Sequence, residues 1–404
     1  MLANPLRLPC GASLPNRIAK SAMSEDLAGP GHLPDGALLA LYSRWARSGA
    51  GLLVTGNVMV DRTALGEPHN VVIEPGAPVA PLAAWATAAQ AGGAQVWPQL
   101  NHPGRQSPRF LSPVPVAPSA VALAIPGVFA VPRALIGPEI LDIIDRFAAA
   151  ARLCQQAGFD GVQVHGAHGY LVSQFLSPLA NLREDEWGGD PERRRRFLIE
   201  VVRAIRAAVG PTFPIGVKLN SADFQRGGFD EAESMAVVEV LEAEGVDLLE
   251  ISGGTYERPA VTGILEEQRA STVAREAYFL AYARRVRSRT RMPLMLTGGF
   301  RTAAGMAAAV EGGAVDVVGL ARPMALQPEL PRGILDGSIA ESKVAPLRSG
   351  IKAADALLEI AWYSWQLKRM SLGKEPDPGV WPWAVLGHTA WDMLRAPGAT
   401  WRAP

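Results

Sequence analysis

Short apolar runs alternate with amphipathic segments along most of this chain, and that alternation restricts the folds open to it. Eight runs rich in Val, Ile and Leu have the length of strands, and continuous apolar runs of this kind suit parallel strands that are buried on both faces. The expected strands are Arg17–Ser21, Gly51–Val58, Gln95–Leu100, Gly161–His165, Ile215–Leu219, Leu248–Ser252, Leu294–Thr297 and Val315–Gly319.

The segments between these runs carry helix signals. Pro138–Gln156 places apolar residues at three- and four-residue spacings along one face. A second helix is expected to begin at Asp190-Pro191, because Asp can cap a helix and Pro fits its first position. Strands alternating with helices predict an α/β protein, a (β/α)8 TIM barrel, with a doubly wound parallel sheet as the competing architecture.

One long stretch interrupts the alternation after the third expected strand. Pro103–Pro138 contains eight prolines, and loops of this length in compact domains are usually functional. We expect this excursion to pass over the ends of the strands.

The last part of the chain is rich in tryptophan. Six of the ten tryptophans follow residue 335, and a disordered tail would not be so aromatic. We therefore expect one barrel domain over residues 1–335 and an extension over residues 336–404 that packs on the barrel or on a neighbouring subunit. The six are Trp362, Trp365, Trp381, Trp383, Trp391 and Trp401.

Charge and composition argue against several classes of protein. The 39 Lys and Arg residues balance the 39 Asp and Glu residues, whereas a nucleic-acid binder would show a basic excess. No apolar run reaches the length of about 18 residues that a membrane span needs, and the N-terminus lacks the apolar core of a signal peptide. Cys10 and Cys154 are too few for a four-thiolate iron–sulfur cluster. We expect a cytoplasmic protein.

Two histidines and a tyrosine follow the fourth expected strand, where barrel enzymes carry catalytic residues. In HGAHGYLVSQFLSP, His165 and His168 supply N–H donors and Tyr170 supplies a phenolic proton. Such a set can hold a carbonyl oxygen and protonate a neighbouring carbon. The spacing also fits a structural pair of histidines, whereas no nearby carboxylate or cysteine completes a zinc site, so we expect no metal.

Glycines and cations follow other expected strands. Thr297–Arg301 and Gly319–Pro323 come after the seventh and eighth strands, where barrels commonly bind phosphate, and Arg322 adds a charge suited to bidentate binding. Gln99 and Lys218 end the third and fifth strands. Together they suit a flat heteroaromatic ring, although each by itself fits a satisfied barrel residue better.

Taken together, these motifs resemble the old yellow enzyme family of FMN-dependent oxidoreductases, in its bacterial, single-domain NADH:flavin oxidoreductase branch. The matching stretches follow the family's order over roughly residues 4–330, and AHGYLVSQFLSP is highly specific. They are NRIAKSAM (16–23), GLLVTGNVMV (51–60), QLNHPGR (99–105), AGFDGVQVHGAHGYLVSQFLSPLANLREDEWGGD (157–190), IGVKLN (215–220), EISGG (250–254), LTGGF (296–300) and GLARP (319–323).

The resemblance implies an enzyme with non-covalent FMN that takes electrons from NADH or NADPH and reduces activated C=C bonds of α,β-unsaturated carbonyl compounds. His165 and His168 are implied to bind the substrate oxygen while reduced flavin gives a hydride to the β-carbon, and Tyr170 to protonate the α-carbon. The implied FMN contacts are Ala22, Ser24, Asn57 or its neighbour Gly56, Gln99 and Lys218 at the ring, and Gly299, Phe300, Ala321 and Arg322 at the phosphate.

Two positions depart from the family's pattern. Ser24 stands where some bacterial relatives have cysteine and others threonine, so its hydroxyl can bond the flavin but thiol tuning is not expected. Gln163 replaces a glutamate that is usual in this branch.

Other functions remain open on the same scaffold. A flavin-dependent oxidative demethylase, or a reductase of CoA thioesters or nitro compounds, would keep the cofactor and change the substrate. A flavin-free barrel that binds a phosphorylated ligand is the rival from another class. For the favoured function we expect a small-molecule alkene substrate, no nucleic-acid or membrane partner, and a homo-oligomer.

Overall fold

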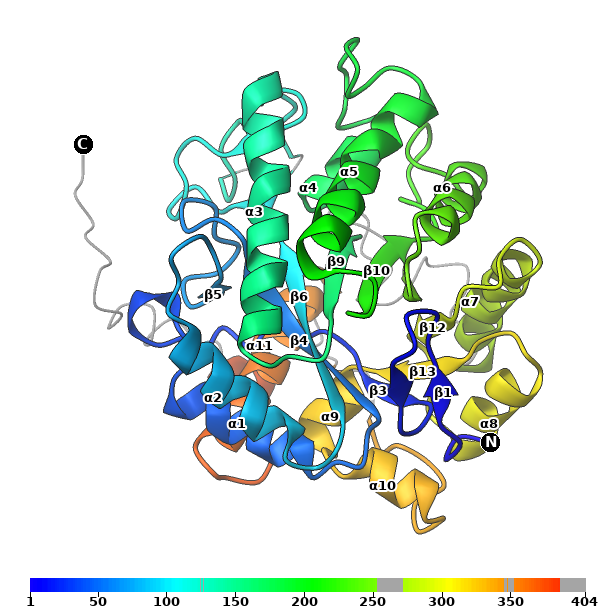
Figure 1. The fold of residues 1–404 in the computed structure, drawn as a ribbon. Coiled ribbons are helices and arrows are strands. Elements are labelled where there is room, and N and C mark those ends of the chain that lie inside the picture. Colours follow the sequence, from blue (N-terminus) through cyan, green and yellow to red (C-terminus); the bar gives the residue numbers. More distant parts are fainter. Residues whose placement is uncertain (124, 126, 253–271, 345–346, 348–351, 386–404) are drawn as a thin grey trace.

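Eight parallel strands close on themselves in the computed structural model, and helices surround them (Figure 1). The structure describes residues 1–123, 125, 127–252, 272–344, 347 and 352–385, so Trp391 and Trp401 lie outside the described residues. The strands follow the order β3-β13-β12-β11-β10-β9-β6-β4, and β3 pairs with β4 to close the ring. This closure confirms the TIM barrel and excludes the doubly wound sheet.

Each expected strand coincides with a barrel strand to within two residues. The agreement follows from the apolar runs, because both faces of these strands are buried. The barrel strands are β3 (Ile18–Lys20), β4 (Leu52–Met59), β6 (Gln95–Asn101), β9 (Val162–Gly166), β10 (Ile215–Asn220), β11 (Leu248–Ser252), β12 (Leu294–Thr297) and β13 (Val317–Leu320), and β5 (Val71–Val72) pairs with the outer part of β4.

Helices connect the strands and cover the outside of the barrel (Figure 1). The expected helix at 138–156 is α3, and the cap expected at Asp190 is present, since its carboxylate accepts from the N–H of Arg193. The helices are α1 (Gly36–Ala46), α2 (Val79–Gln90), α3 (Gly137–Gln156), α4 (Leu171–Leu176), α5 (Pro191–Val209), α6 (Glu231–Ala243), α7 (Thr272–Arg287), α8 (Ala303–Glu311), α9 (Arg322–Leu326), α10 (Leu330–Leu335) and α11 (Lys352–Ser371), with a 3-10 turn η1 (Pro30–His32) before α1.

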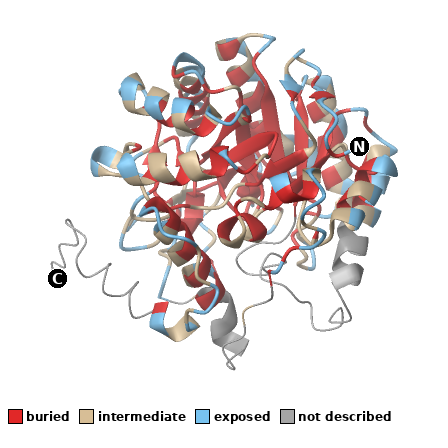
Figure 2. Cartoon of the chain, turned by 90° about the horizontal axis from the view of Figure 1, so that it is seen from below, coloured by how far each residue is buried: buried red, intermediate tan, exposed pale blue. Residues whose placement is uncertain are grey.

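A short hairpin closes the bottom of the barrel, at the N-terminal ends of its strands. β1 (Leu6–Arg7) pairs antiparallel with β2 (Ser13–Leu14). Leu14 belongs to a buried cluster with Trp97, Leu248 and Met295 from three different barrel strands. The interior is therefore packed at this end. A larger cluster of buried apolar residues comes from the strands and from the helices around them. In Figure 2 buried residues are concentrated at the centre of the molecule and exposed residues at its outside.

The excursion after β6 lies against the segment that follows β9. It contains a 3-10 turn η2 (Gly104–Gln106) and two short parallel strands, β7 (Val116–Ala117) and β8 (Arg133–Ala134). Arg183 joins its two arms by donating to the carbonyl oxygens of Pro118, at 2.9 Å, and Leu135, at 2.6 Å.

The C-terminal extension contributes one long helix to the described part of the chain. α11 packs against α1 and α9 of the same chain. The domain boundary near residue 335 stays a prediction. No helix among the described residues is both long enough and apolar enough to cross a membrane.

Candidate active site

Polar residues from widely separated parts of the sequence meet where the barrel strands end. Because the eight strands are parallel, their carboxyl ends share one rim, which we call the mouth. Lys218 lies in register with His165 on one side and with Glu250 on the other, and Gln99 lies beside Gln163. The strand register therefore brings Gln99, Lys218 and His165 together as the sequence predicts.

His165 is buried at the end of β9. Its Nδ1 lies 3.4 Å from the N–H of Ala167, so that nitrogen accepts and the proton is assigned to Nε2. Burial lowers the pKa of His165 well below its usual value, and the nearby His168 and Lys218 lower it further. The imidazole is neutral and offers an N–H donor without a charge.

His168 has a left-handed backbone conformation in the turn between β9 and α4. Its φ is 61°, a conformation uncommon outside glycine. Its N–H donates to Oδ1 of Asn220 at 3.3 Å, and its Nε2 lies 2.8 Å from Oγ of Ser252. Burial, and then Lys218, lower the pKa of His168 well below its usual value. The rings of His165 and His168 meet edge to face with centroids 5.1 Å apart.

Tyr170 is the residue that precedes α4, and its ring packs against His165 with centroids 4.9 Å apart. Its hydroxyl oxygen accepts a hydrogen bond of 3.3 Å from Nδ2 of Asn57 on β4. The structure thus brings His165, His168, Tyr170 and Asn57 into one cluster.

A buried carboxylate that we did not expect connects two of the expected ring-contact residues, Gln99 and Lys218. Glu250, on β11, has no exposed surface and lies 2.9 Å from Nζ of Lys218. It also accepts from Gln163 at 2.8 Å and from Thr297 at 2.7 Å. Gln99 donates to the side chain of Gln163 at 2.7 Å. Gln163, which departs from the family's pattern, therefore links the amide of Gln99 to the carboxylate of Glu250. This network holds the Lys218 ammonium group in place.

Ala22 and Ser24 follow β3 and are half-buried. The hydroxyl of Ser24 donates to the carboxylate of Glu67, which also accepts from the side-chain amide of Asn70. Burial and the neighbouring Asp26 raise the pKa of Glu67 to about 7. Ser24, which departs from the family's pattern, therefore donates a hydrogen bond to a carboxyl group whose pKa lies near neutral pH.

The backbone N–H of Gly56 has a hydrogen-bond partner within the protein. Its N–H donates to Glu25 at 2.8 Å, and Glu25 also accepts from Tyr42 at 2.5 Å. A Cβ at residue 56 would lie 2.0 Å from Glu25, so only glycine fits there. Of the two neighbours that the resemblance left open, Asn57 is the one whose side chain reaches the histidine cluster.

The two glycine-containing loops lie next to each other, because Thr297 and Gly319 are in register on β12 and β13. Gly298 and Gly299 both have left-handed backbones, with φ of 122° and 84°. Phe300 is buried behind them, and Ala321 immediately precedes α9. Arg322 begins α9 and pairs with Glu359 of α11.

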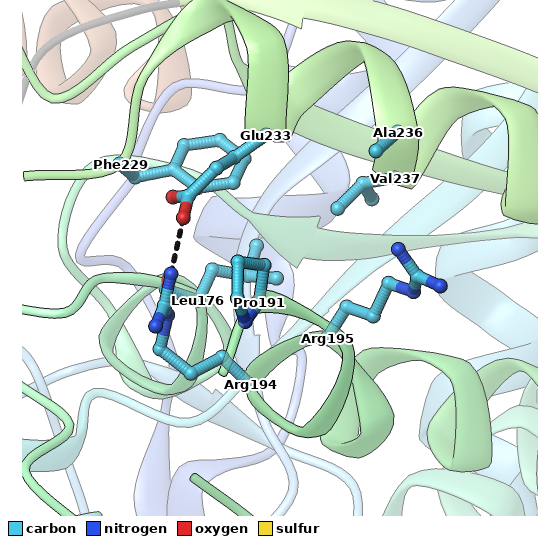
Figure 3. Close-up of a pocket in the computed structure, with 8 residues that line it drawn as sticks. All are labelled: Leu176, Pro191, Arg194, Arg195, Phe229, Glu233, Ala236 and Val237. Atoms are coloured by element: carbon cyan, nitrogen blue, oxygen red, sulfur yellow. Dashed lines mark hydrogen bonds and ion pairs between the residues drawn. The ribbon is translucent and has the colours of Figure 1, made fainter. Parts of the chain in front are cut away.

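A small pocket elsewhere on the barrel belongs to helix packing. It lies between α5 and α6, where Arg194 pairs with Glu233 (Figure 3). None of the predicted site residues lines it.

Four carboxylates that contact the expected site residues were not predicted from the sequence: Glu25, Glu67, Glu250 and Glu359. A signal existed for Glu250, because it is the one charged residue in the apolar run LLEIS and a charge buried in a strand needs a partner. Glu67 and Glu359 lie in segments without a recognisable pattern, and their partners come from elsewhere in the chain.

Comparisons with known proteins bear on this site. The sequence profile of the NADH:flavin oxidoreductase / NADH oxidase family matches residues 2–340. The NADH-dependent flavin oxidoreductase iliE of Hypocrea jecorina (strain QM6a) is 40% identical over 358 residues, which cover 82% of this chain and 88% of that protein. The NADH oxidase of Thermoanaerobacter brockii is 33% identical over 80% of this chain, which spans about half (49%) of that longer protein. Fungal proteins stand among the relatives, so membership of a bacterial, single-domain branch stays unconfirmed.

Solved structures show the same fold. Morphinone reductase in complex with tetrahydroNAD superposes with a TM-score of 0.71 and 27% identity, covering 86% of this chain and 93% of that one. The old yellow enzyme homologue from Zymomonas mobilis has a TM-score of 0.70 and 27% identity, covering 85% and 94%.

Proposed function

The chain belongs to the NADH:flavin oxidoreductase / NADH oxidase family, and on that premise we propose that it reduces activated C=C bonds of α,β-unsaturated carbonyl compounds. It is a flavin-dependent oxidoreductase that uses FMN with NADH or NADPH as reductant. The observation that supports an alkene substrate is the packed cluster of His165, His168 and Tyr170 at the mouth.

The residues at the mouth fit FMN by their chemistry. The Lys218 cation and the Gln99 amide suit the electron-rich, carbonyl-bearing ring. The consecutive glycines at 298 and 299 have positive φ and leave backbone without side chains in the loop that follows β12, the strand next to β13, which leads to Arg322; this suits a phosphate. When bound, FMN supplies the hydride that the reaction needs.

His165 and His168 hold the substrate oxygen. Because both imidazoles are neutral, each can donate an N–H to a carbonyl oxygen. Those hydrogen bonds strengthen as negative charge develops on that oxygen, so they favour the transition state over the bound ketone. The contact between His168 and Ser252 fixes the ring that makes one of these bonds.

Tyr170 supplies the proton. Asn57 donates to its hydroxyl oxygen, which holds the phenol at the mouth, where it protonates the α-carbon of the substrate. The ring packs on His165, so the proton donor and the oxygen-binding group keep a fixed spacing.

Replacing Tyr170 by phenylalanine separates the two halves of the reaction. We expect Tyr170→Phe to slow alkene reduction about 100-fold, the usual contribution of a positioned general acid. Reduction of bound flavin by NADH or NADPH, followed by absorbance at about 460 nm, should keep its rate because it needs no proton from residue 170.

A panel of enones, amines, nitro compounds and CoA thioesters, tested with both nicotinamides, provides the wider test. Turnover of amines or nitro compounds without enones would replace the alkene reductase by one of the other flavin-dependent reactions. Equal slowing of both half-reactions in Tyr170→Phe would refute the proton-donor role. Purified protein that stays colourless after addition of FMN would refute the function as a whole.

A further inference from the structure

The helix α11 reaches the phosphate end of the mouth although it lies beyond the segment that the family profile matches. The matched residues end at 340, whereas α11 spans Lys352–Ser371. α11 packs along α1 and against α9, the short helix that Arg322 begins. The extension therefore touches the element that carries the expected phosphate-binding arginine.

The contact is an ion pair between Arg322 and Glu359. Nη1 of Arg322 donates to Oε1 of Glu359, and the glutamate side chain is only 10% exposed. A carboxylate this deeply buried needs a cation beside it. Arg322 meets that need, and Glu359 in turn restricts the rotation of a long, flexible side chain.

The local charges leave the site suited to an anion. Arg301, Arg322 and Glu359 all lie close enough to Tyr363 to influence its titration. Burial raises the pKa of Tyr363 to about 12, so the phenol stays neutral. Among the charged groups that the structure describes around Tyr363, two cations thus face one carboxylate. A guanidinium carries five N–H donors in a planar fork, so one edge can hold a carboxylate while another binds phosphate.

We propose that Glu359 is a positioning residue for the cofactor phosphate: it holds the Arg322 guanidinium in the orientation that binds the phosphate of FMN, and α11 is thereby part of the cofactor site. The inference rests on the proposed placement of FMN at the mouth. Its physical basis is preorganisation, because a side chain that is ordered before binding loses less entropy when the ligand arrives.

Riboflavin separates this role from a merely structural one, because it has the same ring and lacks the phosphate. The full-length protein is freed of flavin, and the Kd values of FMN and riboflavin are measured by quenching of flavin fluorescence. We expect Glu359→Ala to raise the Kd of FMN about tenfold and to leave the Kd of riboflavin unchanged. Glu359→Gln, which keeps an oxygen acceptor, should give a smaller rise.

The pair Arg194–Glu233 is the matched control (Figure 3). It is also a largely buried arginine–glutamate pair, but it lies between α5 and α6 among residues that have no predicted part in the site. Glu233→Ala should lower thermal stability and leave the ratio of the two Kd values as in the wild type.

Several outcomes would overturn the inference. For Glu359→Ala, these outcomes are an equal change in the Kd values of FMN and riboflavin, no change in the Kd of FMN, or a lower Kd of FMN. For Glu233→Ala, the outcome is a ratio of the two Kd values that differs from that of the wild type. If Glu359→Ala fails to fold, Glu359→Gln decides by the same ratio. Wild-type protein that binds neither flavin would instead refute the proposed function.

Discussion

Burial keeps the two histidines of the mouth neutral, and their chemistry follows from that. An imidazolium pair would bind an anion tightly in the ground state and repel Lys218 beside it. Two neutral imidazoles can donate hydrogen bonds to a neutral carbonyl oxygen. These hydrogen bonds become stronger only as negative charge develops on that oxygen. The same residue types on an exposed helix would titrate near pH 6.5 and lose this property.

Glu67 makes stability depend on pH. Its pKa in the folded protein is about 7, above the ordinary value of 4.5, so the folded state holds a proton that the unfolded state has released between these values. Stability should therefore fall as pH rises from 4.5 to 7. Glu67→Gln removes that loss, because glutamine does not titrate. At pH 8 we expect the free energy of unfolding of the variant to exceed that of the wild type by on the order of 2 kcal/mol.

Urea unfolding of the flavin-free protein at pH 4.5 and pH 8 measures the difference. Glu184→Gln, at an exposed glutamate, controls for the loss of one negative charge. A gain in Glu67→Gln that is the same at both pH values would contradict the assignment.

At the scale of elements, the junction between β9 and α4 delivers three site residues within six positions. His165 is the last but one residue of β9, His168 has a left-handed backbone, and Tyr170 precedes α4. Each conformation points its side chain in a different direction. A regular helix or strand could not bring these three side chains into one cluster.

The helix α5 shows how a local signal sets an element boundary. Asp190 accepts from the N–H of Arg193 at 2.9 Å, and Pro191 occupies the first helical position. Asp190→Ala removes this cap and should lower the free energy of unfolding by about 1 kcal/mol. Urea denaturation measures the loss, and Asp190→Asn should restore most of it. A loss in the asparagine variant as large as in alanine would assign the effect to the ion pair with Arg193 instead.

At the scale of the whole molecule, the two ends of the barrel have different tasks. The β1–β2 hairpin packs the bottom with apolar side chains, whereas polar groups and cations gather at the mouth. Stability and chemistry are thus separated along the barrel axis.

Leu14→Ala tests this separation. Leu14 is fully buried at the bottom, so the substitution should lower the free energy of unfolding by about 3 kcal/mol. The Kd of FMN at the mouth should not change in the folded variant. Leu141→Ala, at a leucine of α3 that is 54% exposed, should have little effect on either quantity. Weaker FMN binding in Leu14→Ala under conditions where it is folded would show that the two ends are coupled.

Much of the fold could be predicted because its signals are local. Apolar runs mark the strands, Asp190 and Pro191 mark a helix start, and the segment after β9 places His165, His168 and Tyr170 at one strand end. Parallel strands then bring their carboxyl ends to one rim whatever the details of packing. The general location of the site follows from these patterns alone.

The partners of the site residues could not be predicted in this way. Gln163 and Glu250 are 87 residues apart, Ser24 and Glu67 are 43 apart, and Arg322 and Glu359 are 37 apart. Their contacts depend on strand register, on a loop position and on the packing of α11.

By itself, therefore, the sequence determined the order of strands and helices, the barrel and the strand ends that carry the chemistry. These properties arise from spacings of two to four residues, which act within one element. Only the tertiary structure decided which carboxylate meets which cation, amide or hydroxyl at the mouth. Such contacts form when the barrel closes and burial forces each polar group to find a partner, wherever in the chain that partner lies.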